Sequence, residues 1–109
     1  MRRGDVVTVA LGSGFGSKPR PALIVQSDAF DTPDTVIVAL FTSDLREAQP
    51  VRPRFEPNET NGLRQTSDLM VDVLATARRS KIGSVIGRLG REEMVRADRA
   101  VVALLGLAG

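Results

Sequence analysis

The chain has 109 residues, of which 42% are hydrophobic and 26% charged, a balance typical of one ordinary globular domain. It contains neither cysteine nor histidine, so its side chains cannot assemble the usual zinc, copper or non-haem iron sites. The lack of histidine also removes the commonest general acid and base near neutral pH. We therefore expect a single domain over residues 1–109 with no metal and no cofactor. Its chemistry must depend on carboxylates, hydroxyls, lysine or arginine.

The formal net charge is only +2, yet all but two of the 15 basic residues are arginine. The planar fork of donors on arginine holds two phosphate oxygens at once, which favours an anionic partner, although a GC-rich genome also enriches arginine. We find no apolar stretch of the length that a signal peptide or a membrane span needs. We expect a cytoplasmic protein with no membrane partner.

Short runs of β-branched and apolar residues, separated by turn residues, occupy most of the chain before residue 90. Residues 5–11 predict a first strand, and the apolar runs within 20–27 and 35–42 predict strands buried on both faces. Pro53 blocks continuous pairing in 51–55, which indicates an exposed or edge strand. Two further strands are predicted at 68–74 and 84–89.

After Gly90 the hydrophobic period changes to that of a helix. We predict a terminal helix over residues 91–105 that packs on the sheet and ends at Gly106. Its expected apolar stripe consists of Met94, Ala97, Val101, Leu104, Leu105 and Ala108. The predicted fold is mainly β, a compact bent antiparallel sheet or small barrel with one C-terminal helix.

Two residues, Phe15 and Arg20, have unusual neighbours in the sequence. Phe15 is a lone aromatic residue in a Gly-rich loop, so it either packs back onto the barrel or a partner subunit, or stacks on a nucleic-acid base. Arg20 lies between Pro19 and Pro21, whose rings restrict the backbone on both sides of it. An arginine at the start of a strand is more often a surface ion-pair partner, so Arg20 alone does not define a site.

Four segments occur together in the order and spacing of a known family. They are Arg3-Gly4-Asp5-Val6-Val7, Arg20-Pro21-Ala22-Leu23-Ile24-Val25 after a Gly-rich loop, Val36-Ile37-Val38-Ala39-Leu40-Phe41-Thr42-Ser43, and Ile86-Gly87-Arg88-Leu89 before Glu92-Glu93-Met94. Over nearly its whole length the chain resembles the MazF/PemK toxins of bacterial toxin–antitoxin pairs. The resemblance implies an SH3-like barrel with a C-terminal helix, a homodimer, and sequence-specific, metal-independent cleavage of single-stranded RNA. It also implies an antitoxin partner whose disordered, often acidic segment blocks the RNA groove.

The resemblance assigns roles to particular residues. The family's arginine before the proline of the second strand falls on Arg20, and its threonine at the end of the third strand falls on Thr42. The guanidinium of Arg20 would hold phosphate oxygens as charge develops, and the hydroxyl of Thr42 would donate to the same phosphate. Asp72 is the nearest carboxylate on a matched strand that is able to take a proton directly or through water. The expected RNA-binding residues are Phe15, Lys18, Ser43 and Arg78.

Two features depart from the family pattern. The loop between the first two strands is shorter than in many relatives. Residues 72–78 keep the acidic residue and the threonine of a segment that in many members also contains glutamine, arginine and a second aspartate, here replaced by Val73, Ala75 and Arg78. These departures suggest a different cleavage sequence.

Two other interpretations stay open at this point. The gyrase poison CcdB resembles this fold but acts by binding a protein and is not a nuclease. A small barrel that binds RNA or peptide without cleaving it is the third possibility. The presence of both Arg20 and Thr42 favours the nuclease, which would use the ribose 2′-hydroxyl as nucleophile and leave a 2′,3′-cyclic phosphate and a 5′-hydroxyl.

Overall fold

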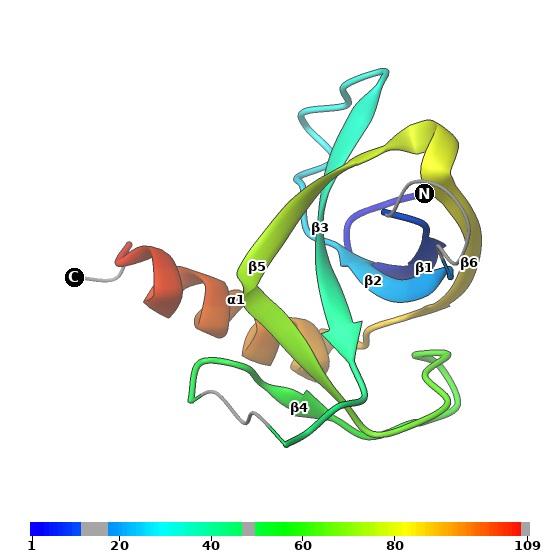
Figure 1. Cartoon of the computed structure of the whole chain (residues 1–109). Helices are drawn as coiled ribbons and strands as arrows, with labels where there is room; N and C mark the ends of the chain where they lie inside the picture. Colours follow the sequence, from blue (N-terminus) through cyan, green and yellow to red (C-terminus); the bar gives the residue numbers. More distant parts are fainter. Residues whose placement is uncertain (12–17, 47–49, 108–109) are drawn as a thin grey trace.

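The structure, a computed structural model, describes residues 1–11, 18–46 and 50–107. The described chain forms a series of strands joined by loops, and one helix follows them (Figure 1). In chain order the elements are β1 (Asp5–Val9), β2 (Arg20–Ile24), β3 (Thr35–Thr42), β4 (Arg54–Phe55), β5 (Ser67–Arg78), the 3₁₀ turn η1 (Arg79–Lys81), β6 (Ile82–Arg88) and α1 (Arg91–Leu105).

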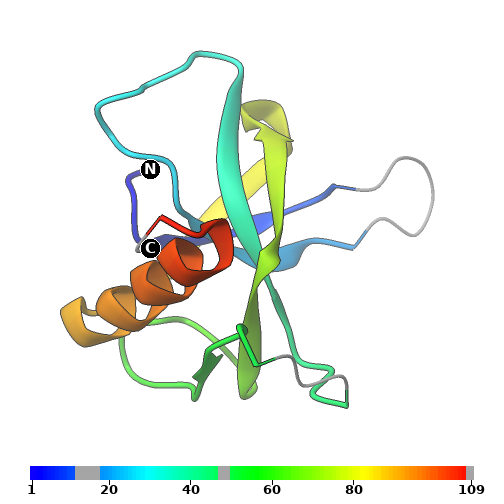
Figure 2. The same ribbon diagram turned by 90° about the vertical axis from the view of Figure 1, so that its left-hand side faces the viewer.

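The described strands form one antiparallel sheet in the order β4-β5-β3-β2-β1-β6. The sheet is strongly curled, and η1 turns the chain so that β6 returns to the far edge beside β1 (Figure 1). The helix α1 lies on the outside of this curl, against β5 (Figure 2). The expectation of a mainly β, small antiparallel barrel with a C-terminal helix is confirmed, with the sheet forming half a barrel.

The central strands are buried on both faces because the curl covers one face and α1 with its neighbouring loops covers the other. In β1, Val6 packs in the cluster that includes Ala97 of α1, whereas Val7 and Val9 pack in a second cluster enclosed by the curled strands. In β3 the buried Phe41 belongs to the first cluster and Val38 to the second. This double burial explains why these strands have apolar residues on both faces.

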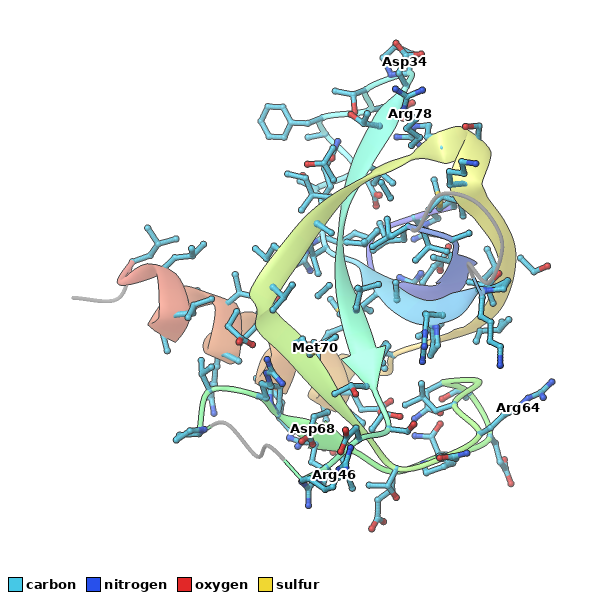
Figure 3. All side chains as sticks on the ribbon, viewed as in Figure 1. Asp34, Arg46, Arg64, Asp68, Met70 and Arg78 are labelled. Carbon is cyan, nitrogen blue, oxygen red and sulfur yellow. The ribbon has the colours of Figure 1, made fainter. Side chains whose placement is uncertain are left out.

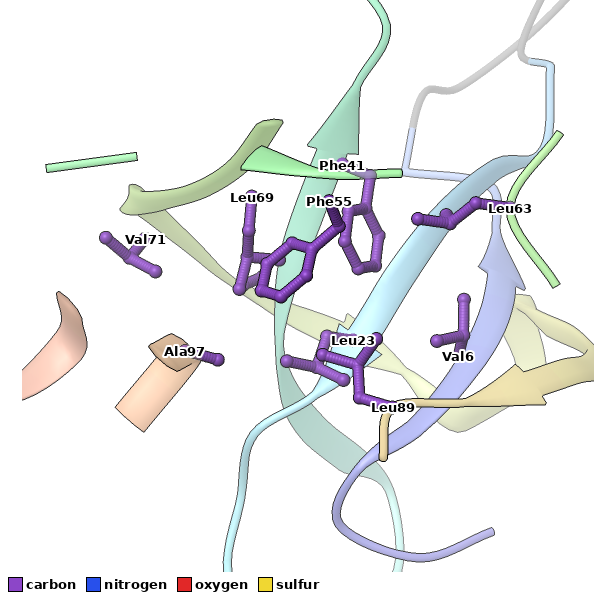
Figure 4. Close-up of a cluster of buried hydrophobic side chains, with 10 residues drawn as sticks. Val6, Leu23, Phe41, Phe55, Leu63, Leu69, Val71, Leu89 and Ala97 are labelled. Carbon is purple, nitrogen blue, oxygen red and sulfur yellow. The ribbon is translucent and has the colours of Figure 1, made fainter. Parts of the chain in front are cut away.

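The larger of the two clusters joins the short edge strand to the helix. Phe41 and Phe55 meet edge to face, with ring centroids 6.3 Å apart (Figure 4). Arg96 of α1 places its guanidinium 4.5 Å from the centre of the Phe55 ring and donates a hydrogen bond to the carbonyl of Arg54. The two-residue strand β4 is therefore held in place by contacts on both sides.

Several strand ends differ from the prediction, and pairing partners explain the differences. The predicted strand 51–55 shortens to β4 because Pro53 has no N–H, although its carbonyl still accepts from Leu69 at 2.9 Å. β5 extends to Arg78, four residues beyond the predicted end, because β3 continues to pair with it as far as Thr35. β1 and β2 end earlier than predicted, and β6 begins earlier.

The helix begins and ends where the sequence predicts. A carboxylate oxygen of Glu93 accepts the N–H of Gly90 at 3.0 Å and so satisfies a free donor at the helix start. Gly106 adopts the left-handed conformation, with φ at 71°, that commonly ends helices. Among the described residues no helix is long and apolar enough to cross a membrane.

Only the first half of the predicted apolar stripe packs on the sheet. Ala97 is buried and Met94 and Val101 pack against the core, but Leu104 and Leu105 are 39% and 54% exposed. The prediction of a fully packed stripe is wrong at this end because the helix extends past the edge of the sheet (Figure 1). Ala108, the last predicted member of the stripe, lies outside the described residues.

The segment 56–66 between β4 and β5, here called the 56–66 loop, packs with its backbone directly against β6. A Cβ atom on Gly62 would lie 2.1 Å from the carbonyl oxygen of Ile86, and one on Gly87 would lie 2.3 Å from the carbonyl carbon of Asn61. Gly62 also has a positive φ of 71°. Glycine is therefore required on both sides of this contact.

We predict that Gly62→Ala lowers the free energy of unfolding by more than about 3 kcal/mol, because it combines a steric clash with an unfavourable φ. Gly106→Ala is the matched control, since Gly106 has the same φ of 71° but open space around it. That variant should cost only about 1 kcal/mol. Thermal and urea unfolding measure both values, and equal losses would contradict the close packing of the loop on β6.

Candidate functional site

A cavity of about 560 Å³ lies where β2 begins and β3 ends, and we call it the β2–β3 cavity. Its volume is in the range of small-ligand sites. Four further elements contribute to its wall: the 56–66 loop, the first residue of β5, and one residue each from β1 and β6. The lining residues are Thr8, Pro19, Arg20, Pro21, Phe41, Ser43, Gly62, Leu63, Arg64, Gln65, Ser67 and Ile86.

Strand pairing places Arg20 at the edge of this cavity. Ala22 of β2 pairs with Leu40 of β3 in an antiparallel register. Continuing that register by two residues puts Arg20 opposite Thr42, on the same face of the sheet. The Arg20 side chain is exposed and lines the cavity. The β2–β3 pairing therefore brings the start of β2, with Arg20, close to the end of β3, with Thr42. Thr42 itself is not among the described residues that line the cavity.

The end of β3 supplies hydroxyl groups beside Arg20. Ser43 is exposed and lines the cavity, and the half-buried Thr42 precedes it. The Oγ1 atom of Thr42 accepts a hydrogen bond from the N–H of Asp44 at 3.1 Å. Because a hydroxyl has one donor and two acceptor positions, this bond orients the group and leaves its hydrogen available for an anion.

The carboxylates beside Thr42 are held by arginine. Hydrogen bonds from the Arg46 side chain, at 2.9 and 2.8 Å, and from its backbone N–H lower the pKa of Asp44 to about 2. Asp68, which pairs across from Thr42 in the β3–β5 register, is buried and accepts two bonds from Arg54, at 2.8 and 3.2 Å. These carboxylates are therefore engaged in ion pairs next to the site.

Asp72 is not among the described residues that line the β2–β3 cavity. It accepts two hydrogen bonds from Arg52, at 2.7 and 2.8 Å, and these lower the pKa of its carboxyl group below the ordinary 3.8. A carboxylate with a lowered pKa is a poor proton acceptor at neutral pH. The geometry favours an ion pair that fastens the chain before β4 to β5.

The predicted RNA-contact residues near the start of β2 lie at or beside the cavity. Ser43 is part of the lining, and Lys18 is exposed next to the lining residue Pro19. Phe15 lies outside the described residues. Together with Arg20, the described members of this group surround the entrance with donors that suit an anion.

Arg78 is the exception, because it lies at the opposite end of the sheet. It pairs with Thr35, seven residues along β3 from Thr42, which corresponds to about 23 Å. Figure 3 shows Arg78 at the far end of β5 from Arg64, a lining residue of the cavity. Arg78 is exposed and belongs to a separate surface.

No sequence pattern singles out Arg64 or Gln65, although both are exposed residues of the cavity wall. The only sequence signal nearby is the Asn61-Gly62 turn, which indicates a loop but not the strands that it faces. Arg20 and Arg64 take part in none of the ion pairs found within residues 1–11, 18–46 and 50–107. Within the same ranges, acidic residues form no cluster of three or more that would suit a metal ion.

The fold and the site together define a small curled β-sheet protein with a cationic, hydroxyl-bearing cavity at one sheet end. The family model of PemK-like, MazF-like toxins of type II toxin–antitoxin systems matches residues 2–105. The chain is also 44% identical over 109 residues, the whole of both chains, to a probable endoribonuclease MazF of Mycolicibacterium smegmatis (strain ATCC 700084 / mc(2)155). The protein belongs to this family of PemK-like, MazF-like toxins.

Solved structures of more distant relatives have the same fold. An endoribonuclease in complex with its cognate antitoxin, from a mycobacterial species, superposes with a TM-score of 0.77 at 23% identity, over 97% of this chain and 93% of that one. MazF from Deinococcus radiodurans gives a TM-score of 0.74 at 18% identity, over 97% of this chain and 96% of that one. At these identities the likeness establishes the architecture.

We predict that the Arg52–Asp72 pair stabilises the fold above about pH 4. Because the pKa of Asp72 is lower in the folded protein than its ordinary 3.8, the stabilisation is lost as the pH falls below that value. The variant Asp72→Asn should be less stable at pH 7 by about 1 kcal/mol and should lose less stability on acidification. Urea unfolding at pH 7 and pH 3 tests this, and parallel losses in both proteins would contradict it.

Proposed function

We propose that the protein is a toxin whose whole chain, residues 1–109, acts as a sequence-specific, metal-independent endoribonuclease on single-stranded RNA. The observation that supports this most directly is that Arg20, at the start of β2, lines the same cavity as Ser43, the residue that follows Thr42 at the end of β3. The 44% identical relative is a probable endoribonuclease MazF, and this gives independent support.

The proposed reaction is an internal transfer of the phosphodiester. The ribose 2′-oxygen attacks the adjacent phosphorus while the bond to the 5′-oxygen breaks, and the products are a 2′,3′-cyclic phosphate and a 5′-hydroxyl. The 2′-hydroxyl loses its proton and the departing 5′-oxygen gains one. Negative charge grows on the non-bridging oxygens during attack, so the protein's main task is to stabilise that charge.

Arg20 and the hydroxyl groups of β3 are suited to that task. The guanidinium stays charged at every working pH and holds two oxygens in one plane. The Thr42 hydroxyl is oriented by its bond from Asp44, and its stiff β-branched side chain loses little freedom on binding. We assign Arg20 and Thr42 to the reacting phosphate. The proposed role of Asp72 in proton transfer is tested separately below, since its carboxylate already accepts two hydrogen bonds from Arg52.

The remaining predicted contacts form the path of the RNA strand in this proposal. Ser43 and Lys18 contact phosphates next to the site. Phe15, outside the described residues, stacks on a base. Arg78 contacts the RNA backbone beyond the cavity, since its strand partner Thr35 lies about 23 Å along β3 from Thr42.

We also propose that the toxin is a cytoplasmic homodimer that binds an acidic segment of a cognate antitoxin. The exposed apolar residues at the end of α1, with Leu107 at 72% exposed, favour burial against a second copy. One structural relative is an endoribonuclease in complex with its cognate antitoxin. The arginines of the cavity would attract the carboxylates of such a segment.

The alternatives are a CcdB-like gyrase poison and a barrel that binds RNA or peptide without cleaving it. Neither needs an arginine and two hydroxyls at one cavity. An assay for RNA cleavage, run beside an assay for gyrase inhibition, separates the three functions.

We predict that the purified protein cleaves a long single-stranded RNA at full rate in excess EDTA and leaves 5′-hydroxyl ends. The charge-stabilising groups belong to the chain itself, and its sequence contains no histidine or cysteine. End-labelling with and without prior phosphatase treatment identifies the ends, and Arg20→Ala prepared in parallel controls for contaminating nucleases. A strict need for magnesium, or 5′-phosphate ends, would rule out the mechanism.

A second prediction concerns the shape of the Arg20 side chain. Arg20→Lys keeps the charge but loses the planar fork, so the rate should fall about 10²- to 10³-fold while RNA binding survives in part. Thr42→Ala should also lose activity, and Thr42→Ser, which keeps the hydroxyl, should restore most of it. Single-turnover rates and circular dichroism of each variant measure activity and folding. A folded Arg20→Lys variant within about threefold of wild type would make Arg20 an electrostatic anchor only.

The role of Asp72 is tested by Asp72→Asn in the same assay. Loss of a general base typically costs about 10²- to 10⁴-fold in rate. Because Arg52 holds this carboxylate and the cavity lies elsewhere, we expect the variant to stay within about threefold of wild type. A hundredfold loss in a folded variant would return Asp72 to the catalytic site.

A further inference from the structure

Asn61 is fully buried, and its side chain connects the 56–66 loop to the helix. Its Oδ1 atom accepts hydrogen bonds from the N–H groups of Asn58 and Leu63, at 3.2 and 3.0 Å. Its Nδ2 atom donates to the carbonyl of Glu56 at 2.9 Å and to Oε2 of Glu93 at 3.1 Å. The side-chain amide thus uses all four of its hydrogen-bonding positions.

Glu93 has two tasks, one for each carboxylate oxygen. Oε2 accepts from Asn61, and Oε1 accepts the N–H of Gly90 at the start of α1. A glutamine at this position has only one acceptor oxygen, so it satisfies one of these donors and presents an N–H₂ group to the other. The link from helix to loop therefore depends on the carboxylate itself.

The other side of the loop is fastened to β6. The carbonyl of Thr60 accepts from the N–H of Arg88 at 2.7 Å, and Gly62 packs against the carbonyl of Ile86. With Asn61 tied to α1 and its neighbours tied to β6, the backbone of the loop is held from two directions. The residues that follow are positioned by these two attachments.

Those following residues are Leu63, Arg64 and Gln65, which line the β2–β3 cavity together with Arg20. Leu63 is buried, while the side chains of Arg64 and Gln65 are exposed. A guanidinium pairs with the two acceptors on the edge of guanine, and an amide pairs with a base edge that offers one donor and one acceptor. Contacts of this kind discriminate bases, whereas phosphate contacts only position the strand.

We propose that Arg64 and Gln65 determine which bases the toxin accepts next to the cleaved phosphate, and that Asn61, held by Glu93, is the positioning residue for this wall. The inference rests on the proposed RNA cleavage, which it deepens by naming the part of the site that selects sequence. In this proposal the first turn of α1, which lies outside the cavity, affects substrate selection through the hydrogen bond between Glu93 and Asn61.

The first test compares cleavage profiles on a random-sequence single-stranded RNA, with the new 5′ ends sequenced. Arg64→Ala and Gln65→Ala should each change the preference at a base beside the cut by about tenfold. Arg99→Ala, an exposed arginine on α1, is the control for loss of one charge and should keep the wild-type profile. Wild-type base preference in both wall variants would overturn the assignment.

The second test concerns the support. Glu93→Gln should weaken the same base preference as the wall variants and lower kcat/KM on the preferred sequence more than on others. Glu92→Gln removes the same charge from the neighbouring exposed residue and should leave the profile unchanged. Asn61→Ala should also weaken this base preference. If Asn61→Ala does not fold, the result for Glu93→Gln alone tests the positioning role. A folded Glu93→Gln variant with the wild-type profile would overturn the positioning role.

Binding of an uncleavable 2′-O-methyl RNA pool separates this inference from the proposed function. Selective binding that the wall variants alter, without cleavage by the wild type, supports the wall and overturns the nuclease. Cleavage with a base preference that none of the variants changes supports the nuclease and overturns the wall. The absence of both cleavage and selective binding overturns both.

Discussion

The pairing of β3 with β2 on one side and β5 on the other is the constraint on which the site depends. Because this strand is buried on both faces, sliding it by one residue would exchange its two sets of apolar side chains between the clusters. The register that avoids this exchange pairs Ala22 with Leu40, and so brings the start of β2 to the end of β3. The same register places Arg78 at the other end of the sheet. Packing of the core thus decides the geometry of the cavity.

Arginine has two different roles in this chain, and the local surroundings separate them. Arg52 and Arg54 each form a two-bond ion pair with an aspartate of β5 and stabilise the region around the short strand β4. Arg20 and Arg64 line the cavity and join no such pair among the described residues. A cation without a protein carboxylate retains its donors for an external anion. The proposed RNA contact therefore depends on two features of the cavity: Arg20 and Arg64 line it, and neither is paired with an aspartate in the described part of the chain.

Local signals were sufficient for the elements whose ends are set within their own sequence. β3 is predicted at its observed bounds because it is a continuous apolar run between turn residues, and α1 because Gly90 and Gly106 flank a helical period. β4 is shorter and β5 longer than the sequence predicts, because the lengths of both strands depend on their partners. Pro53 removes a donor from one, and continued pairing with β3 extends the other. The exposed end of α1 likewise depends on where the sheet stops.

The sequence by itself determined the fold class and the family resemblance, because the first follows from local strand and helix patterns and the second from four short segments in order along the chain. The resemblance then singled out Arg20 and Thr42 as the residues proposed to contact the phosphate. Only the tertiary structure decided which groups share the cavity with them. Asp72, chosen for its strand, is turned to Arg52, and Arg64 and Gln65 enter the wall through a loop that is held by Asn61 and β6. The physical reason is that a side chain's partners are set by long-range pairing and by close backbone contacts such as Gly62 on Ile86. Such contacts join segments 20 or more residues apart, and no local pattern records them.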